Sequence, residues 1–138
     1  MNKLVIFDLD GTLLNTIDDL GTAANHTLAE LGLPQHTLDE YRLMVGNGMR
    51  KLIMRALPQD KASDDAFIDS TLKQFLEYYA AHIDVYTKPY PGIPELINTL
   101  STDGYKLAVA SNKIQAGAEK LIAEFFPGIP FEAVMGNS

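Results

Sequence analysis

The chain has 138 residues, of which 46% are hydrophobic, and this suits either one ordinary domain or a small core that carries an insertion. Eleven basic against eighteen acidic residues give a net charge of −7, which disfavours nucleic acid as a partner. The chain has no cysteine, no signal-peptide core and no apolar stretch of membrane-spanning length, which favours a cytoplasmic protein that neither enters nor crosses a membrane.

The first part of the chain is predicted to form one strand and then only helices. Residues 4–8 are apolar up to the first aspartate, which is typical of a buried parallel strand. Apolar residues with helical spacing then predict helices at about 18–31, 38–44, 49–57 and 64–82. No segment between residues 15 and 86 alternates like a strand, so this stretch is expected to be wholly helical.

The last part of the chain is predicted to alternate between helices and strands. Residues 87–92 form a rigid connector rich in proline and glycine. A helix at 93–100, a strand at 105–111, a helix at 114–125 and a strand at 131–135 follow. Right-handed crossovers would make the strands parallel, so the fold class is α/β with a helical insertion after the first strand. We expect residues 1–14 and 88–138 to form the α/β core and residues 15–87 to form a helical cap.

Asp8 and Asp10 stand two residues apart at the end of the first predicted strand. Side chains two apart on a strand point to the same side, where two carboxylates repel each other unless a cation lies between them. This spacing predicts a hard divalent metal ion. Gly11 allows a sharp turn, and Thr12 adds a hydroxyl group beside any bound anion. A plain polar strand end or a helix N-cap explains neither the spacing nor the following Gly-Thr pair.

Two motifs, and the start of a helix between them, resemble those of the haloacid dehalogenase superfamily and of its phosphoglycolate phosphatase-like branch with a helical cap. The segment from Asp8 to Leu13 is similar to the first motif, and Ser111-Asn112-Lys113 to the second. Tyr90 to Ile93 resembles the opening of the helix that precedes the second motif. The resemblance implies a Rossmann-like parallel sheet, present here as a partial core that lacks its last strands.

By this resemblance, Asp8 is the nucleophile that becomes an aspartyl-phosphate, and Asp10 is the general acid and base. Mg²⁺ would bind the Asp8 carboxylate and the Asp10 main-chain carbonyl. The implied function is a Mg²⁺-dependent phosphatase of a small phosphorylated metabolite, with 2-phosphoglycolate as the best single substrate. Related enzymes that cleave pyrophosphate or sugar phosphates, or that isomerise sugar phosphates, share the same core residues and remain alternatives.

The resemblance also implies contacts to the phosphate and to the rest of the substrate, made by Thr12, Ser111, Asn112, Lys113, Gly48 and Arg50. Ser111 and the amides of the following helix suit phosphate oxygens, and Arg50 suits a substrate carboxylate. Two structural alternatives stay open. Ser111 and Asn112 are also typical caps for a helix that begins near Ile114, and the glycines at 46 and 48 are also typical of one helix ending and another beginning.

The superfamily's third motif, a lysine, and its fourth, an acidic cluster, both follow the third strand, whereas the sequence ends at Ser138. We therefore expect a fragment of a longer enzyme, or else an inactive truncated chain that only binds phosphate or a partner. The first strand is expected to have an exposed edge or a different partner. His26, His36 and His82 lack ligand-like spacing and are predicted to be surface residues without a role. The oligomeric state stays open.

Overall fold

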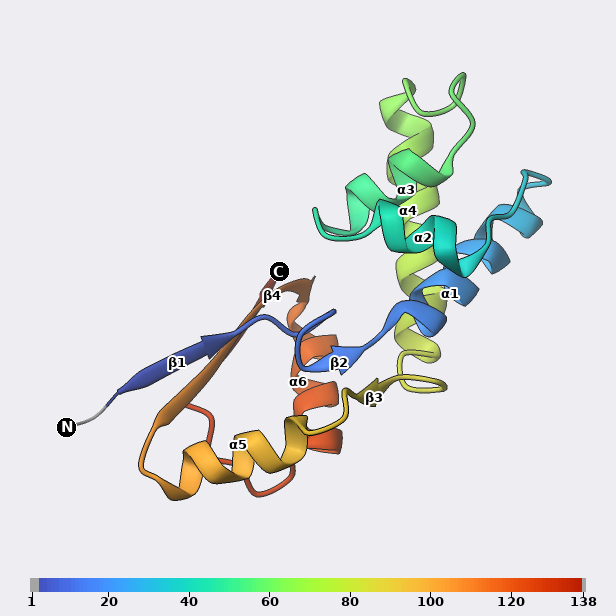
Figure 1. Cartoon of the computed structure of the whole chain (residues 1–138). Helices are drawn as coiled ribbons and strands as arrows, with labels where there is room; N and C mark the ends of the chain where they lie inside the picture. The colour runs from blue at the N-terminus through green and yellow to red at the C-terminus, as the bar shows by residue number, and fades with distance from the viewer. Residues whose placement is uncertain (1–2, 138) are drawn as a thin grey trace. The chain divides into compact units, whose positions relative to one another are not determined.

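The computed structural model describes residues 3–137, and the chain forms two compact units (Figure 1). The α/β unit comprises the residues up to Thr16 together with those from Thr87 on. The helical unit comprises Ile17–Tyr86. None of the helices in the described residues combines the length and the apolar character needed to span a bilayer.

The α/β unit is built on a parallel sheet of β1 (Leu4–Phe7), β4 (Lys106–Ile114) and β5 (Ala133–Asn137). The strands lie in the order β1-β4-β5, with Leu4 opposite Lys106 and Ala108 opposite Ala133. This arrangement confirms the predicted parallel strands. Strand β4 is longer than predicted, and its register with β5 shifts between Ala110 and Ile114.

Two helices cover this sheet. Helix α5 (Ile93–Thr102) packs on β4, and helix α6 (Gln115–Phe125) packs on β4 and β5. Both crossovers advance the chain in the same direction across the sheet, so right-handed connections place both helices on one face. The fully or almost fully buried side chains of this unit include Ile97, Leu107, Val109, Ala118 and Leu121.

Strand β1 is less buried than its apolar sequence predicts. Leu4 is 55% exposed and Ile6 is 57% exposed. Leu4 and Ile6 stand two residues apart and so point to the same face of a sheet whose two helices both lie on one face, and β1 is also an edge strand that pairs with β4 on one side. The prediction of a buried strand is therefore wrong for these two side chains, and the expected exposed edge is present.

A small antiparallel pair was not predicted. Strand β2 (Leu14–Asn15) pairs with β3 (Lys88–Pro89), with Leu14 opposite Pro89. Two-residue strands are too short to show an alternating pattern, and proline argues against a strand unless it lies at an edge. This pair joins the first segment of the α/β unit to the segment that the sequence predicts as a rigid connector.

The helical unit consists of α1 (Ile17–Glu30), α2 (Leu38–Met44), α3 (Met49–Ala56) and α4 (Asp65–Ala81). These bounds agree with the four predicted helices to within one or two residues. Helix α4 packs against both α1 and α3. Its buried residues, Ile68, Thr71, Phe75 and Tyr79, recur at helical spacing. Amphipathic patterning therefore accounts for the packing of this unit.

A polar network ties α1 to the loop before α2. The Asn25 side chain donates to His36 O at 2.8 Å and accepts from His36 N at 2.9 Å. The Tyr41 hydroxyl donates to Asn25 Oδ1 at 2.5 Å, and burial raises the pKa of Tyr41. The ring of His36 bonds Ala56 O through Nε2 at 2.7 Å. The surface prediction is therefore wrong for His36, which is half-buried, although His26 and His82 are exposed.

Candidate active site

Asp8 follows the last residue of β1, at the carboxyl end of the strand. Its side chain is exposed, and Oδ1 accepts a hydrogen bond from Leu9 N at 2.7 Å. In open α/β sheets, ligands bind beyond the carboxyl ends of the strands. The carboxylate is therefore oriented by its neighbour's amide and open to a ligand from solvent.

Asp10 is placed by a tight turn and not by the strand, which ends at Phe7. Gly11 N donates to Leu14 O at 2.9 Å, and Leu14 N donates to Leu9 O at 3.0 Å. Gly11 has a φ of 80°, in the left-handed region that favours glycine. The strand alternation from which we argued therefore does not extend to Asp10. Its position is determined by the hydrogen bonds of the turn.

The cation beside Asp10 in this structure is the ammonium group of Lys113. Lys113 Nζ lies 3.1 Å from Asp10 Oδ1, and the lysine side chain is 2% exposed. Asp10 Oδ1 is buried and accepts no hydrogen bond of good geometry from the described residues. The contact is therefore an ion pair, and it joins the first sequence motif to the second.

Ser111 and Asn112 lie in the irregular part of β4, where the sequence predicts Ser111 to be the last residue of the strand. The Ser111 hydroxyl accepts from Lys113 N at 3.0 Å, and Asn112 O accepts from Asn137 Nδ2 at 2.9 Å. The N-cap of α6 is Ile114, without a side-chain hydrogen bond, so neither residue caps that helix. The capping alternative is therefore wrong. Ser111 is half-buried, and its hydroxyl hydrogen is left to donate elsewhere.

Thr12 lies in the turn between Asp10 and β2, and its side chain is exposed. The turn places this hydroxyl group on the same loop as both aspartates.

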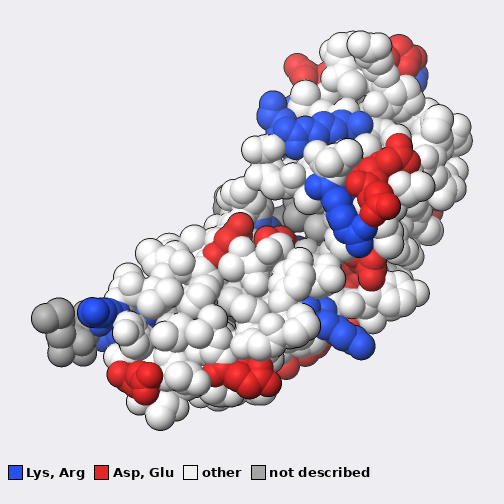
Figure 2. All heavy atoms as spheres, in the orientation of Figure 1, with Lys and Arg blue, Asp and Glu red and all other residues white. Residues whose placement is uncertain are grey.

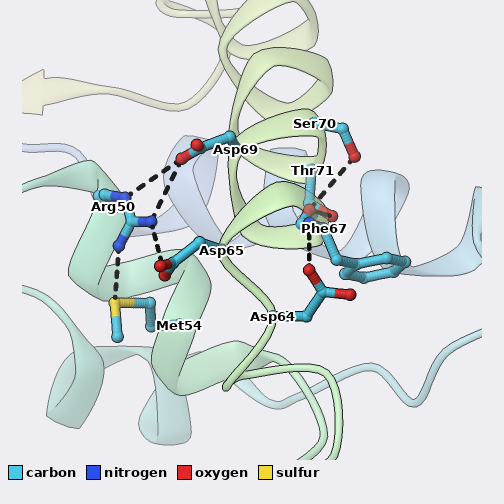
Figure 3. Close-up of polar contacts among 8 residues, drawn as sticks. All are labelled: Arg50, Met54, Asp64, Asp65, Phe67, Asp69, Ser70 and Thr71. Carbon is cyan, nitrogen blue, oxygen red and sulfur yellow. Dashed lines mark hydrogen bonds and ion pairs between the residues drawn. The ribbon is translucent and has the colours of Figure 1, made fainter.

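Gly48 and Arg50 belong to the helical unit. Gly48 is the N-cap of α3 with a φ of 88°, in the left-handed region that favours glycine. Arg50, the second residue of α3, pairs with Asp65 at 3.3 Å and with Asp69 at 3.2 Å, both on α4 (Figure 3). Met54 Sδ accepts a weak hydrogen bond from Arg50 Nη1 at 3.3 Å. The resemblance implied that the Arg50 guanidinium binds a substrate carboxylate. In this structure it is paired with two carboxylates of its own unit.

Arg55 was missed by the sequence analysis, although it holds the loop that contains Gly48. It donates to Met44 O at 2.7 Å and to Asn47 Oδ1 at 2.8 Å. A basic residue in the last turn of a helix is common for electrostatic reasons, so its sequence position carries no sign of this role. The loop conformation depends on Arg55 as well as on the glycines.

The oxygen atoms near β1 fit part of a magnesium site. Mg²⁺ is usually held by one or two carboxylates together with substrate phosphates and waters. The exposed Asp8 carboxylate suits this role, whereas Asp10 Oδ1 faces an ammonium group. No group of three or more His, Cys, Asp or Glu side chains with metal-binding geometry occurs in residues 3–137. The donor set fits an ion bound by Asp8, a main-chain oxygen and a substrate, and not a closed protein cage.

Basic side chains do not form a continuous strip on the face drawn in Figure 2. There, the lysines and arginines of the described residues are dispersed among acidic and neutral side chains. The acidic net charge of −7 repels an anion at long range, so a phosphate would depend on local donors.

The sequence is similar to a known family and to curated proteins of that family. The family model described as haloacid dehalogenase-like hydrolase matches residues 5–138. The phosphoglycolate phosphatase of Aquifex aeolicus strain VF5 is 37% identical over 120 residues, covering 87% of this chain and 54% of that protein. The chain therefore spans about half the length of this curated relative.

Solved structures have the same fold. A predicted phosphoglycolate phosphatase from Haemophilus somnus 129pt superposes with a TM-score of 0.84 at 28% identity, over 99% of this chain and 63% of that one. CbbY from Rhodobacter sphaeroides, solved in complex with phosphate, superposes with a TM-score of 0.77 at 27% identity, over 99% and 64%. The α/β fold class with a helical insertion is confirmed by these similarities.

Proposed function

Because the chain belongs to the haloacid dehalogenase-like hydrolase family, we propose that it carries the nucleophile and the proton-transfer group of a phosphatase for small phosphomonoesters. The observation that best supports this is the loop after β1, which carries an exposed Asp8 and an Asp10 held by Lys113. The α/β unit would then be the catalytic core and the helical unit its cap.

In the proposed reaction, an Asp8 carboxylate oxygen forms a bond to phosphorus while the ester P–O bond breaks. Asp10, protonated on the oxygen that does not face Lys113, gives its proton to the leaving alkoxide, so the alcohol departs neutral. Asp10 then takes a proton from water, whose oxygen attacks phosphorus and breaks the bond to Asp8. Inorganic phosphate leaves, and both aspartates return to their starting states.

The phosphate group needs local compensation for its charge. Mg²⁺, held by Asp8 and the Asp10 main-chain carbonyl, supplies that compensation when bound. The Ser111 hydroxyl accepts from Lys113 N, which orients its hydrogen toward another acceptor such as a phosphate oxygen. Thr12 and Asn112 are exposed polar groups on the same two segments and are proposed as weaker contacts.

The proposed substrate is 2-phosphoglycolate, which carries a carboxylate as well as a phosphate. The name of the Aquifex aeolicus relative supports this choice. Arg50 is proposed to bind that carboxylate in place of Asp65 or Asp69, and Gly48 to allow close backbone approach at the start of α3. Both exchanged partners are exposed, so the replacement costs little.

The test is phosphate release from a panel of phosphomonoesters, with and without Mg²⁺. Because the chain spans about half of its relative, the assay is run on this chain and on a version extended at the C-terminus to the relatives' length. We expect Mg²⁺-dependent release that is fastest with 2-phosphoglycolate. Faster release from pyrophosphate or from a sugar phosphate would instead favour one of the related activities.

Asp8→Asn tests the nucleophile. We expect it to abolish release, because an amide oxygen cannot form the acyl phosphate. The matched control is Asp103→Asn, an exposed acid just after α5, which should keep the activity of the unaltered chain. Activity that survives in Asp8→Asn would overturn the assignment.

A further inference from the structure

We propose that Lys113 is a positioning residue that holds the Asp10 carboxylate, and that it is not a ligand of the substrate phosphate. This inference rests on the proposed function, because it assigns the lysine a part in the work of Asp10. The primary observation is the 3.1 Å separation of Lys113 Nζ and Asp10 Oδ1, with the lysine side chain 2% exposed. An ammonium group buried to this degree is closed to a substrate that enters from solvent.

The local conformation of β4 fixes the backbone around Lys113. The register of β4 against β5 shifts between Ala110 and Ile114, so the regular ladder is interrupted where Lys113 stands. The Ser111 hydroxyl accepts from Lys113 N at 3.0 Å, a local turn that replaces a ladder bond. The lysine is thereby aimed into the protein, although it sits near a strand end.

Strand β5 holds the same segment from the other side. A Cβ on Gly136 would lie 2.6 Å from Lys113 O and 2.8 Å from Gln115 Cα, so only glycine fits without movement. The Gln115 side chain donates to Val134 O at 2.6 Å and accepts from Gly136 N at 2.5 Å. These bonds bridge the interrupted ladder and leave the backbone of Lys113 little freedom.

The pair leaves part of Asp10 accessible. The Asp10 side chain is 24% exposed, whereas Oδ1 is buried, so the exposed area belongs to other atoms of the side chain. One oxygen is anchored by the ammonium group while the carboxyl group still reaches the surface. A general acid and base needs this combination, because its proton must move to and from a reacting atom in a fixed direction.

Steady-state kinetics of Lys113→Met and Lys113→Arg, alone and with Asp10→Asn, test the inference in the active form of the protein. We expect Lys113→Met to lower kcat by about tenfold to a hundredfold, a share of what general acid–base catalysis contributes. KM should change by less than about threefold. Lys113→Arg keeps the charge and should recover part of the loss.

The double-mutant cycle separates the two roles of Lys113. If the lysine acts through Asp10, Lys113→Met should cause no further loss once Asp10→Asn is present. A loss that persists in the Asp10→Asn background, together with a raised KM, would overturn the inference and make Lys113 a phosphate ligand. Gly136→Ala, which displaces the lysine's backbone without removing its charge, should lower kcat in the same direction.

A spectroscopic measurement keeps this inference distinct from the proposed function. In ¹⁵N-labelled protein, a buried ammonium group paired with Asp10 should give a signal protected from exchange with water, and Asp10→Asn should shift or remove it. A missing signal in an active protein would overturn the inference alone. A protected signal in a protein that releases no phosphate under any condition would overturn the proposed function, and with it the catalytic meaning of the pair.

Discussion

In the α/β unit, Lys113 meets Asp10 in a buried ion pair, whereas in the helical unit Arg50 meets Asp65 and Asp69 at the surface. The Lys113 side chain is 2% exposed and that of Arg50 is 41% exposed, with Asp65 at 87%. Water screens the Arg50 contacts and can replace either partner at little cost. It cannot do the same for the Lys113 contact, where the lysine side chain and Asp10 Oδ1 are both buried and removal of one partner is costly.

This difference suits the roles that we propose for the two units. Groups that form and break bonds must keep their geometry through the reaction, so a buried pair with a fixed backbone serves them well. A group that recognises a substrate must exchange one partner for another. An exposed arginine that already binds carboxylates can make this exchange without a large loss of stability.

The largest expected difference between the two ion pairs is in what each contributes to the free energy of unfolding. Lys113→Met should lower the free energy of unfolding by about 3 kcal/mol, because it leaves Asp10 Oδ1 buried without its cation. Arg50→Met, the matched change in the helical unit, should cost about 0.5 kcal/mol. Urea unfolding followed by circular dichroism gives both values. Equal losses would show that burial does not distinguish the two ion pairs.

The second prediction concerns how each unit tolerates an added methyl group. Gly136→Ala should cost about 2 kcal/mol, because its nearest neighbours are backbone atoms at 2.6 to 2.9 Å. The added Cβ of Gly21→Ala in α1 would lie 2.8 Å from Leu38 Cδ2, the end of a partly exposed side chain, and 3.0 Å from Cδ2 of the buried Tyr41 ring. Leu38 can rotate away and alanine favours a helix, so the loss should be smaller than that of Gly136→Ala, at about 1 kcal/mol or less. A similar loss of stability in both variants would contradict the inference that the backbone around Lys113 has little freedom to move.

Sequence patterns predicted much of the fold because the relevant information is local. The apolar stripe of α4 predicted a helix at 64–82, and the helix spans Asp65–Ala81. The run before Asp8 predicted a strand, and β1 is present. Periodicity is a property of neighbouring residues, so tertiary contacts are not needed to detect it.

What could not be predicted depends on residues far apart in the chain. Asp10 and Lys113 are separated by the whole helical unit, so neither position indicates that its partner lies 3.1 Å away. The same holds for Arg50, whose partners on α4 stand 15 and 19 residues further on. We expected a metal ion between the two aspartates, and the structure adds an ammonium group beside Asp10 that the sequence did not indicate.

A third prediction sharpens the comparison, because the helical unit has a buried polar group of its own. Tyr41 is fully buried, and burial raises its pKa above the ordinary value of 10.0. A pKa raised on folding contributes stability that is fully present below pH 10 and is lost as the pH rises through the folded pKa. The free energy of unfolding should therefore fall more steeply above pH 10 in the unaltered chain than in Tyr41→Phe.

At neutral pH, Tyr41→Phe should itself cost about 1 kcal/mol, since the hydrogen bond to Asn25 is lost. Tyr86→Phe, at an exposed position, is the control for removing one tyrosine. If both variants follow the same alkaline profile, the buried hydroxyl of Tyr41 does not control stability in that range.

The smallest expected effect is at the start of α2, where all the charges are exposed. Glu40 accepts a hydrogen bond from Thr37 N at 2.9 Å, and this bond lowers the pKa of Glu40 below 4.5. A pKa lowered on folding contributes stability above the unfolded pKa that is lost as the pH falls through the folded one. Glu40→Gln keeps the capping geometry without the charge, so its melting temperature should drop slightly at pH 7 and match the unaltered chain at pH 3.

Glu77→Gln on α4 is the control for losing one exposed acid. If Glu40→Gln lowered the melting temperature at pH 7 by more than Lys113→Met does, an exposed contact in the helical unit would contribute more to stability than the buried pair in the α/β unit. The expected difference between the two units would then be wrong.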